Sequence, residues 1–132
     1  MSNPSGTTKV DGITYKEAIN MENTLKPVPW HFTIVFDEDK AMRNGYDVDA
    51  LYDYVGENVE PLGNIRIGRG SWQAKSREVQ FGAQCPAVAM LVKQPWVMMN
   101  IKSLTTYEDM NEPDGEDYLA IVRRTRPELI LD

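Results

Sequence analysis

Hydrophobic and polar residues alternate with a changing period along the chain, and the period predicts the element in each stretch. Residues 30–36 are aromatic and β-branched and contain no carboxylate or amine, which predicts a strand buried on both faces. In residues 48–62 the hydrophobic side chains recur every three or four positions, which predicts a helix with one apolar face. Asp47 is suited to cap the beginning of this helix, and Gly63 is suited to end it.

Four further segments complete the predicted domain. Residues 65–74 alternate around a glycine turn and predict a β-hairpin. Residues 86–93 predict a second helix with Pro86 at its first position, where a missing amide hydrogen costs little. The apolar stretches 101–107 and 118–122 predict two more strands. The expected order is strand, helix, strand, strand, helix, strand, with one added strand at the end.

This order is that of the split βαβ arrangement. We therefore expect an α+β, ferredoxin-like fold (βαββαβ plus a C-terminal strand), preceded by an N-terminal arm and a short helix. Both long helices would cover one face of the sheet. The other face would keep apolar side chains that need a partner, so we expect a homodimer, or cover by the N-terminal helix.

The first 29 residues differ from the rest of the chain. Residues 1–12 are rich in Ser, Gly, Thr, Asn and Pro, which is typical of a mobile arm. Thr14 and Glu17 have the spacing of a capping box, which predicts a short helix ending near Asn23, and the prolines after it predict an extended linker. We accordingly divide the chain into an arm with its helix and linker, a folded domain and a C-terminal tail, at residues 1–29, 30–126 and 127–132.

Composition narrows the class of protein. With 132 residues, of which 42% are hydrophobic and 26% charged, the chain has room for one globular domain. Its longest apolar runs, residues 32–36 and 87–92, are too short to span a bilayer, so we expect a soluble, cytoplasmic protein with no membrane partner. The single cysteine, Cys85, and the single histidine, His31, exclude an internal disulfide and a multi-histidine metal site. We expect both to be packing residues.

The formal charge of −6 and the pI near 4.8 argue against binding of nucleic acid over the whole surface. The predicted hairpin is a local exception, because no acidic residue occurs between positions 61 and 76. The basic, hydroxyl and indole side chains in and around the hairpin are suited to bind the phosphates and a base of RNA; they are Arg66, Arg69, Ser71, Trp72 and Arg77. The alternative is that the arginines form ion pairs with the acidic loop at 108–117, in the same or a partner subunit, and that Trp72 belongs to the core.

Several short strings within residues 32–124 occur in the order found in a known family. They are Phe36-Asp37 closing the first strand, Gly45-Tyr46 and Leu62-Gly63 around the first helix, Gly70-Ser71 in the hairpin, Leu91 with Pro95-Trp96, and residues 118–122. In these strings the chain resembles the virulence-associated protein D family, relatives of the small ferredoxin-like subunit of CRISPR adaptation complexes. Residues 1–29 lie outside the resemblance, and Pro86 and the long acidic loop depart from it.

The resemblance implies a homodimeric, magnesium-dependent endoribonuclease of a toxin or defence system, with Asp37 as catalytic residue and metal ligand. A two-fold related copy would bring a second Asp37 carboxylate near the first, so that one metal ion could be shared at a scissile phosphate. From the residues alone, Asp37 and Asp39 are as well suited to cap the loop or helix after the strand.

Three functions therefore stay open. The first is the magnesium-dependent endoribonuclease. The second is a catalytically inert acidic binding protein, such as an inhibitor, antitoxin or phage antagonist, that engages a basic protein partner; the net charge and the acidic loop favour it. The third is an assembly subunit whose N-terminal arm lies along a neighbour.

Overall fold

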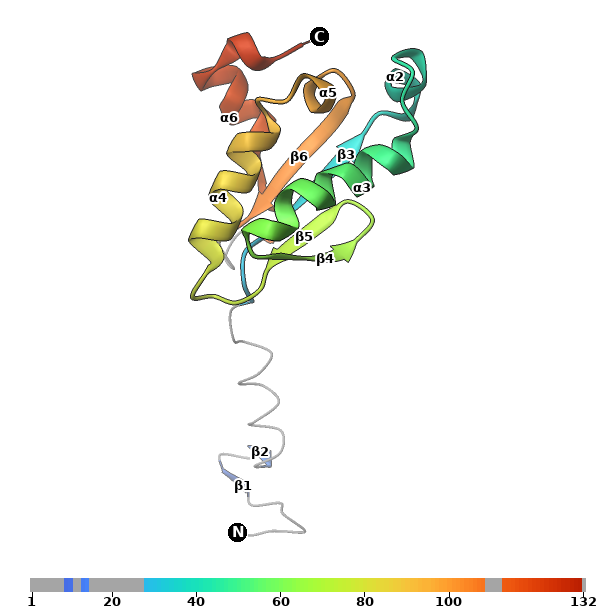
Figure 1. Cartoon of the computed structure of the whole chain (residues 1–132). Coiled ribbons are helices and arrows are strands. Elements are labelled where there is room, and N and C mark those ends of the chain that lie inside the picture. The colour runs from blue at the N-terminus through green and yellow to red at the C-terminus, as the bar shows by residue number, and fades with distance from the viewer. Residues whose placement is uncertain (1–8, 11–12, 15–27, 109–112, 132) are drawn as a thin grey trace.

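A five-stranded antiparallel sheet is the centre of the computed structural model, which describes residues 9–10, 13–14, 28–108 and 113–131. The strands lie in the order β4-β5-β3-β6-β7 (Figure 1). Their bounds are His31–Phe36 for β3, Asn64–Gly68 for β4, Ser71–Ala74 for β5, Ile101–Tyr107 for β6 and Glu116–Asp117 for β7. A separate antiparallel pair joins β1, Lys9–Val10, to β2, Ile13–Thr14.

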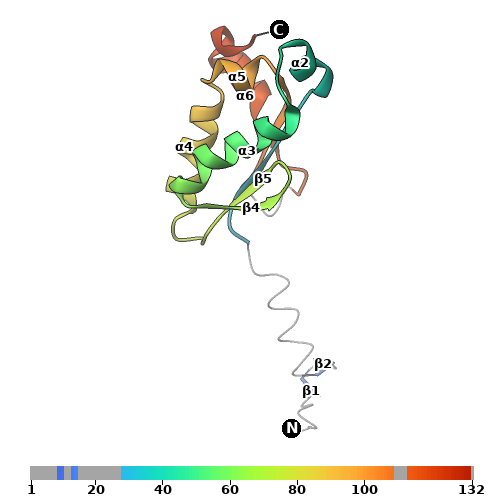
Figure 2. The same cartoon turned by 45° about the vertical axis from the view of Figure 1, so that its right-hand side comes forward.

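Two long helices, α3 and α4, lie side by side over one face of this sheet (Figures 1 and 2). Shorter helices gather at the end of the sheet where β3 stops and β6 begins. The bounds are Glu38–Arg43 for α2, Val48–Val59 for α3, Gln80–Leu91 for α4, Pro95–Met98 for α5 and Tyr118–Thr125 for α6, with 3-10 turns η1 at Glu60–Leu62 and η2 at Pro127–Leu129.

The connections make this a ferredoxin-like α+β fold, as predicted. The units β3-α3-β4 and β5-α4-β6 interleave, so that β5 lies between β3 and β4, and β3 lies between β5 and β6. The added strand is β7, which pairs with the free edge of β6. It is formed by two residues of the predicted acidic loop and not by the apolar stretch after it.

The central strand β3 is buried on one face only. Phe32, Ile34 and Phe36 are buried under the helices, whereas the alternate residues are half-buried. The prediction of a strand buried on both faces is therefore wrong, because the helices cover a single face. The resulting core extends from β3 to Leu51 and Val55 of α3 and to further residues of α4 and β6.

The face without helices is mostly polar where β5, β3 and β6 cross it. His31 pairs with Gln73 on one side and Tyr107 on the other, and Thr33 pairs likewise with Ser71 and Thr105. The apolar surface expected to require a partner is thus not present on these strands. In the edge strand β4, Ile65 pairs with Gln73 and is 50% exposed, so some apolar surface is present at that edge, and the homodimer stays a prediction.

The helix predicted for residues 48–62 is formed by α3 and the 3-10 turn η1 that follows it. The Asp47 carboxylate accepts a hydrogen bond from the amide of Asp49 at 3.1 Å, which caps the first turn. After Val59 the chain tightens into η1, and Gly63 ends it at a φ of 112°, a left-handed conformation that favours glycine.

Helix α4 begins six residues earlier than predicted, at Gln80, and contains Pro86 in its interior. Proline lacks the amide hydrogen that would bond the carbonyl four residues earlier, and its ring crowds that carbonyl. Here that residue is Gly82, which is exposed like Pro86, so water can hydrogen-bond the carbonyl. The proline is tolerated because it lies on the outer side of the helix.

Two other assignments differ from the sequence prediction. Residues 118–122, predicted as a strand, belong to helix α6. The Asp117 side chain caps this helix by accepting a hydrogen bond from the amide of Ala120. Leu119 and Val122, three positions apart, are buried in the core. A short apolar run has no period that separates strand from helix, which explains the error. Helix α2, after β3, was not predicted.

The predicted helix near the N-terminus falls, apart from Thr14 in β2, on residues outside those described. Within the described part of the chain, none of the helices is long and apolar enough to cross a membrane.

Candidate functional site

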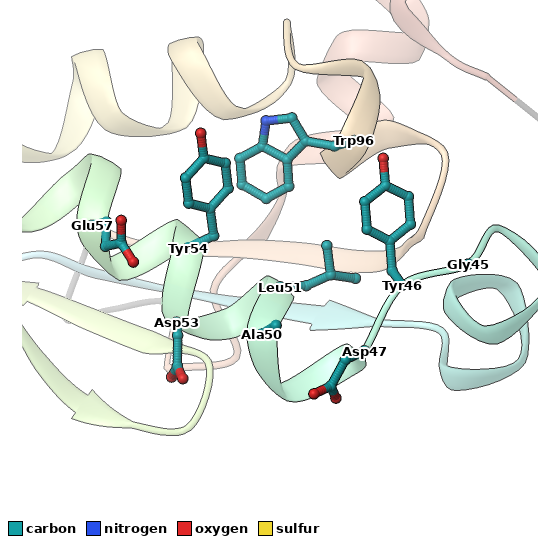
Figure 3. Close-up of a pocket in the computed structure, with 9 residues that line it drawn as sticks. All are labelled: Gly45, Tyr46, Asp47, Ala50, Leu51, Asp53, Tyr54, Glu57 and Trp96. Atoms are coloured by element: carbon teal, nitrogen blue, oxygen red, sulfur yellow. The ribbon is translucent and has the colours of Figure 1, made fainter.

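A groove of about 640 Å³ runs along α3 on the side that faces α5 (Figure 3). Nine residues line it: Gly45, Tyr46, Asp47, Ala50, Leu51, Asp53, Tyr54, Glu57 and Trp96. The aromatic rings of Tyr46, Tyr54 and Trp96 stand on the same side of it. The ring centres of Tyr54 and Trp96 are 4.8 Å apart at an angle of 49°, and Tyr54 is 49% exposed. The groove thus presents aromatic faces to solvent.

Two asparagines fix the walls of the groove. Asn100 is fully buried, and its amide donates a hydrogen bond to the carbonyl of Trp96 at 2.8 Å. Asn44, in the turn after α2, donates to the side-chain oxygen of Asn100 at 2.8 Å and to the carbonyl of Met99 at 3.0 Å. The turn that carries Tyr46 and the helix that carries Trp96 are therefore joined by hydrogen bonds, which favours a preformed site.

The three carboxylates of the groove are not equivalent. Asp47 caps α3, and Asp53 forms an ion pair with Arg66 at 2.9 Å on the other side of the helix. Both point away from the three rings in Figure 3. Glu57 lies three residues after Tyr54 on the same helix and has no ion-pair partner within the part of the chain that the structure describes. Glu57 is therefore the carboxylate of the groove that is open to a ligand.

The groove was not predicted from the sequence. Two of its rings, Tyr46 and Tyr54, are eight residues apart, just before α3 and in the middle of it, but Trp96 is remote in the sequence and only the fold brings it beside them. One signal was present in the sequence: Tyr54 lies outside the apolar face of an amphipathic helix, so its ring is not part of the core between helix and sheet.

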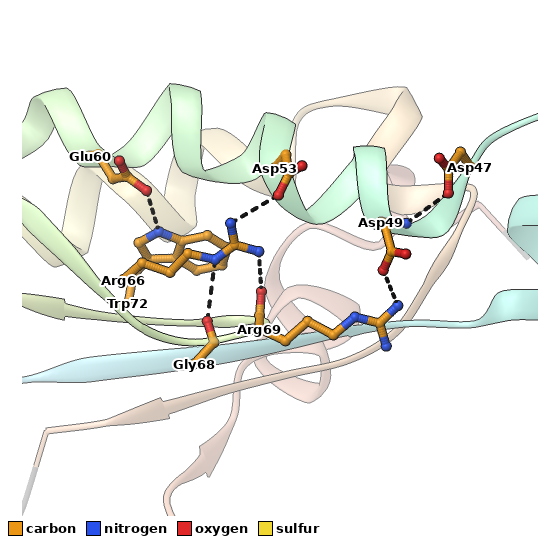
Figure 4. A network of polar contacts seen from close by, with 8 residues as sticks. All are labelled: Asp47, Asp49, Asp53, Glu60, Arg66, Gly68, Arg69 and Trp72. Atoms are coloured by element: carbon orange, nitrogen blue, oxygen red, sulfur yellow. Dashed lines mark hydrogen bonds and ion pairs between the residues drawn. The ribbon is translucent and has the colours of Figure 1, made fainter.

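Three of the residues predicted to bind RNA, Arg66, Arg69 and Trp72, form polar contacts with α3 and η1 (Figure 4). Among the described residues, Arg66 pairs with Asp53 of α3, and Arg69 pairs with Asp49 of α3 and, at 3.9 Å, with Glu38 of α2. The hydrogen bond from Arg69 to Asp49 raises the pKa of Arg69 above its ordinary value. The alternative to RNA binding named the acidic loop as the partner of these arginines, whereas the carboxylates that they contact here belong to helices α3 and α2.

Trp72 does not offer a face for base stacking. It is fully buried, packs on Phe32 and donates a hydrogen bond from its indole nitrogen to Glu60 at 3.0 Å. Ser71 points to the opposite face of the sheet, where its hydroxyl lies 2.7 Å from that of Thr33. Arg77 is exposed in the turn before α4. The prediction that Trp72 stacks on an RNA base is therefore wrong, and the five predicted residues do not lie on one surface.

Asp37 lies directly after β3 and caps α2. Its carboxylate accepts a hydrogen bond from the amide of Lys40 at 3.0 Å, and its own amide donates to the carbonyl of Asn100 at 2.8 Å. The bond from the Lys40 amide, with the nearby charges of Lys40 and Arg43, lowers the pKa of Asp37. These contacts show Asp37 in the capping role that is the alternative to metal binding.

A magnesium ion needs several oxygen ligands. Among the described residues, no group of three or more His, Cys, Asp or Glu side chains is placed to hold a metal ion. Asp37 is instead surrounded by a cap hydrogen bond and two cations, so its environment within one chain does not fit such an ion.

A second, smaller recess of about 120 Å³ lies between α2, β6 and α6. Three cationic side chains from these elements line it, namely Lys40, Lys102 and Arg123, together with apolar residues. No carboxylate of the described residues lines it. On a chain with a net charge of −6, this is a local positive site next to the helix that Asp37 begins.

The single histidine and cysteine lie away from both recesses. The imidazole of His31 stacks on Tyr107 with ring centres 4.3 Å apart, and burial lowers its pKa. Its buried Nδ1 has no hydrogen-bond partner among the described residues. Burial raises the pKa of the Cys85 thiol, which reduces the thiolate that nucleophilic chemistry requires.

Comparison with models of protein families, with curated proteins and with solved structures finds no match to this chain. The resemblance to virulence-associated protein D therefore stays a prediction that rests on the short strings quoted above.

Proposed function

We propose that this chain is a catalytically inert binding protein that receives a basic protein partner in the groove between α3 and α5. The observation that supports this function is the groove itself, which combines three partly exposed aromatic rings with an open carboxylate. Aromatic residues are enriched at the centres of protein interfaces, and a ring next to a carboxylate attracts cationic groups.

The charge around the groove agrees with a basic partner. Residues 44–65 contain five carboxylates and no lysine or arginine. Two of these carboxylates are neutralised by arginines from the hairpin, but the remainder leave the α3 surface negative. Such a surface steers a positively charged partner toward the groove and repels nucleic acid.

The test is binding of a purified partner. Affinity capture from the source cells supplies the candidates, and each recovered protein is then titrated in isolation against wild type and Tyr54→Ala. We expect a stoichiometric complex that the variant weakens at least about tenfold, because Tyr54 forms the exposed centre of the groove. Phe81→Ala removes an even more exposed ring on α4 and is the control, which should leave affinity unchanged. Equal affinity of Tyr54→Ala and wild type would contradict this function.

The magnesium-dependent endoribonuclease is the second candidate. The observation that favours it is the recess lined by Lys40, Lys102 and Arg123, which offers positive charge for RNA phosphates beside the helix that begins at Asp37. Because one chain supplies a single capped carboxylate there, this candidate also needs the homodimer. Purified protein with magnesium would cleave RNA, and Asp37→Asn would slow cleavage about a hundredfold. Intact RNA together with a monomeric mass in light scattering rules this candidate out.

A further inference from the structure

Two arginines are bound on the hairpin side of α3 in the same manner. The guanidinium of Arg66 lies 5.1 Å from the centre of the Trp72 ring and pairs with Asp53 (Figure 4). The guanidinium of Arg69 lies 4.6 Å from the centre of the Tyr52 ring and pairs with Asp49. Each arrangement has three parts: an aromatic ring, a carboxylate from α3 and an arginine.

The α5 side of the same helix holds the first two parts of a third arrangement. Tyr54 and Trp96 supply tilted aromatic faces, and Glu57 supplies a carboxylate from α3 (Figure 3). No lysine or arginine is among the residues that line the groove within the described chain. The groove therefore lacks the cation that the two arrangements on the hairpin side contain.

We infer that the groove is a receptor for an arginine side chain of the partner, which would lie over the rings of Tyr54 and Trp96 and pair with Glu57. This inference rests on the proposed function and names the group that is recognised. A volume of about 640 Å³ is within the range of pockets that enclose a small ligand, so one side chain fits with room for its flanking backbone.

Arginine fits this site better than lysine does. The guanidinium group is planar, stacks on aromatic rings and directs several N–H donors toward a carboxylate in one plane. It is also more weakly hydrated than an ammonium group, so less solvation is lost when it enters an aromatic groove. The two complete arrangements in this chain both use arginine, although the sequence also contains lysines.

Capped Gly-Arg-Gly, Gly-Lys-Gly and Gly-citrulline-Gly peptides test the inference on the full chain. Citrulline has nearly the shape of arginine without its charge, so it separates charge from shape. The three tryptophans give three indole N–H signals in NMR, and those of Trp30 and Trp72 serve as internal references. We expect the Trp96 signal to move with the arginine peptide at about millimolar concentration, to move less with lysine and to stay in place with citrulline.

Two variants, at Glu57 and at a matched position, complete the experiment. Glu57→Gln keeps the size of the side chain and removes its charge, so we expect the affinity for the arginine peptide to fall about fivefold to tenfold. Glu78→Gln removes an exposed carboxylate in the turn before α4 and should leave the affinity unchanged. Equal shifts with arginine and citrulline, or equal losses in both variants, would overturn the inference.

The outcomes also separate this inference from the proposed function. A partner complex that Tyr54→Ala weakens, together with no response to the arginine peptide, overturns arginine recognition and leaves the binding function standing. A Trp96 response to the arginine peptide that Glu57→Gln reduces supports the inference by itself.

Discussion

Gly56 in α3 lies directly against the indole of Trp72 in β5. A Cβ at position 56 would come within 3.3 Å of Cζ2 of Trp72 and within 2.7 Å of the Glu60 oxygen that accepts the indole hydrogen bond. The helix approaches the sheet this closely because residue 56 has no side chain, so this glycine serves packing and not a turn.

Gly56→Ala should therefore destabilise the protein, although alanine is the better helix former. We expect a loss of about 1–3 kcal/mol, the usual cost of overpacking, because Trp72 is fully buried and cannot move aside. Gly82→Ala is the control. A Cβ there meets nothing within 4 Å, so the substitution should raise the free energy of unfolding by about 0.5–1 kcal/mol. Urea denaturation measures both, and a gain in stability at both positions would contradict the packing argument.

Asn64→Ala tests a buried hydrogen-bond network that joins α3, β4 and α4. The Asn64 amide donates to the carbonyls of Val59 at 2.8 Å and Ala83 at 2.9 Å, and its oxygen accepts from Gln84 at 2.8 Å. The substitution leaves these buried groups without partners, so we expect a loss of at least about 2 kcal/mol in denaturant unfolding. Asn58→Ala, which removes an exposed bond to the Tyr54 carbonyl, should cost less than about 1 kcal/mol. Equal losses in the free energy of unfolding for Asn64→Ala and Asn58→Ala would show that the buried network adds nothing to stability.

The parts of the fold that the sequence predicts are those where several local signals agree. The segment formed by α3 and η1 has helical periodicity, an aspartate before it and a glycine after it, and these three signals agree on residues 48–62. The start of α4 was missed because Pro86 signals a first position, and only the exposure of Pro86 and Gly82 in the folded chain explains why the helix passes through it. Local sequence carries no information on that exposure.

The site was less predictable than the fold because it depends on which face each residue takes. Trp72 was a candidate for RNA stacking until its pairing with Phe32 placed it under α3. A shift of one residue in the register would have exposed it. The groove forms because α5 packs beside α3 and brings the ring of Trp96 next to that of Tyr54. No local sequence motif contains both residues.

Substitutions at Asp37 separate capping from charge. Asn keeps a side-chain acceptor for the Lys40 amide, so Asp37→Asn should lower the melting temperature less than Asp37→Ala does. The folded-state pKa of Asp37 is lowered, chiefly by that hydrogen bond, so its charge stabilises the fold above the ordinary aspartate pKa. This stabilisation is lost as the pH falls through the lowered value. Thermal melts from pH 7 down to acid should therefore show wild type and Asp37→Asn converging.

Protonation of His31 should destabilise the protein in mildly acidic solution. Burial lowers its pKa below the ordinary value of about 6.5, and its neighbours across the sheet, Gln73 and Tyr107, offer no carboxylate to stabilise an imidazolium. The unfolded chain then binds more protons than the folded chain just below pH 6.5, so stability falls as the pH decreases from about 7 toward the lowered pKa and levels off beneath it. Because this is the single histidine, one imidazole signal in an NMR titration reports the pKa directly. Urea unfolding at several pH values should show a smaller decrease for His31→Gln than for wild type, and a measured pKa above 6.5 would contradict the burial argument.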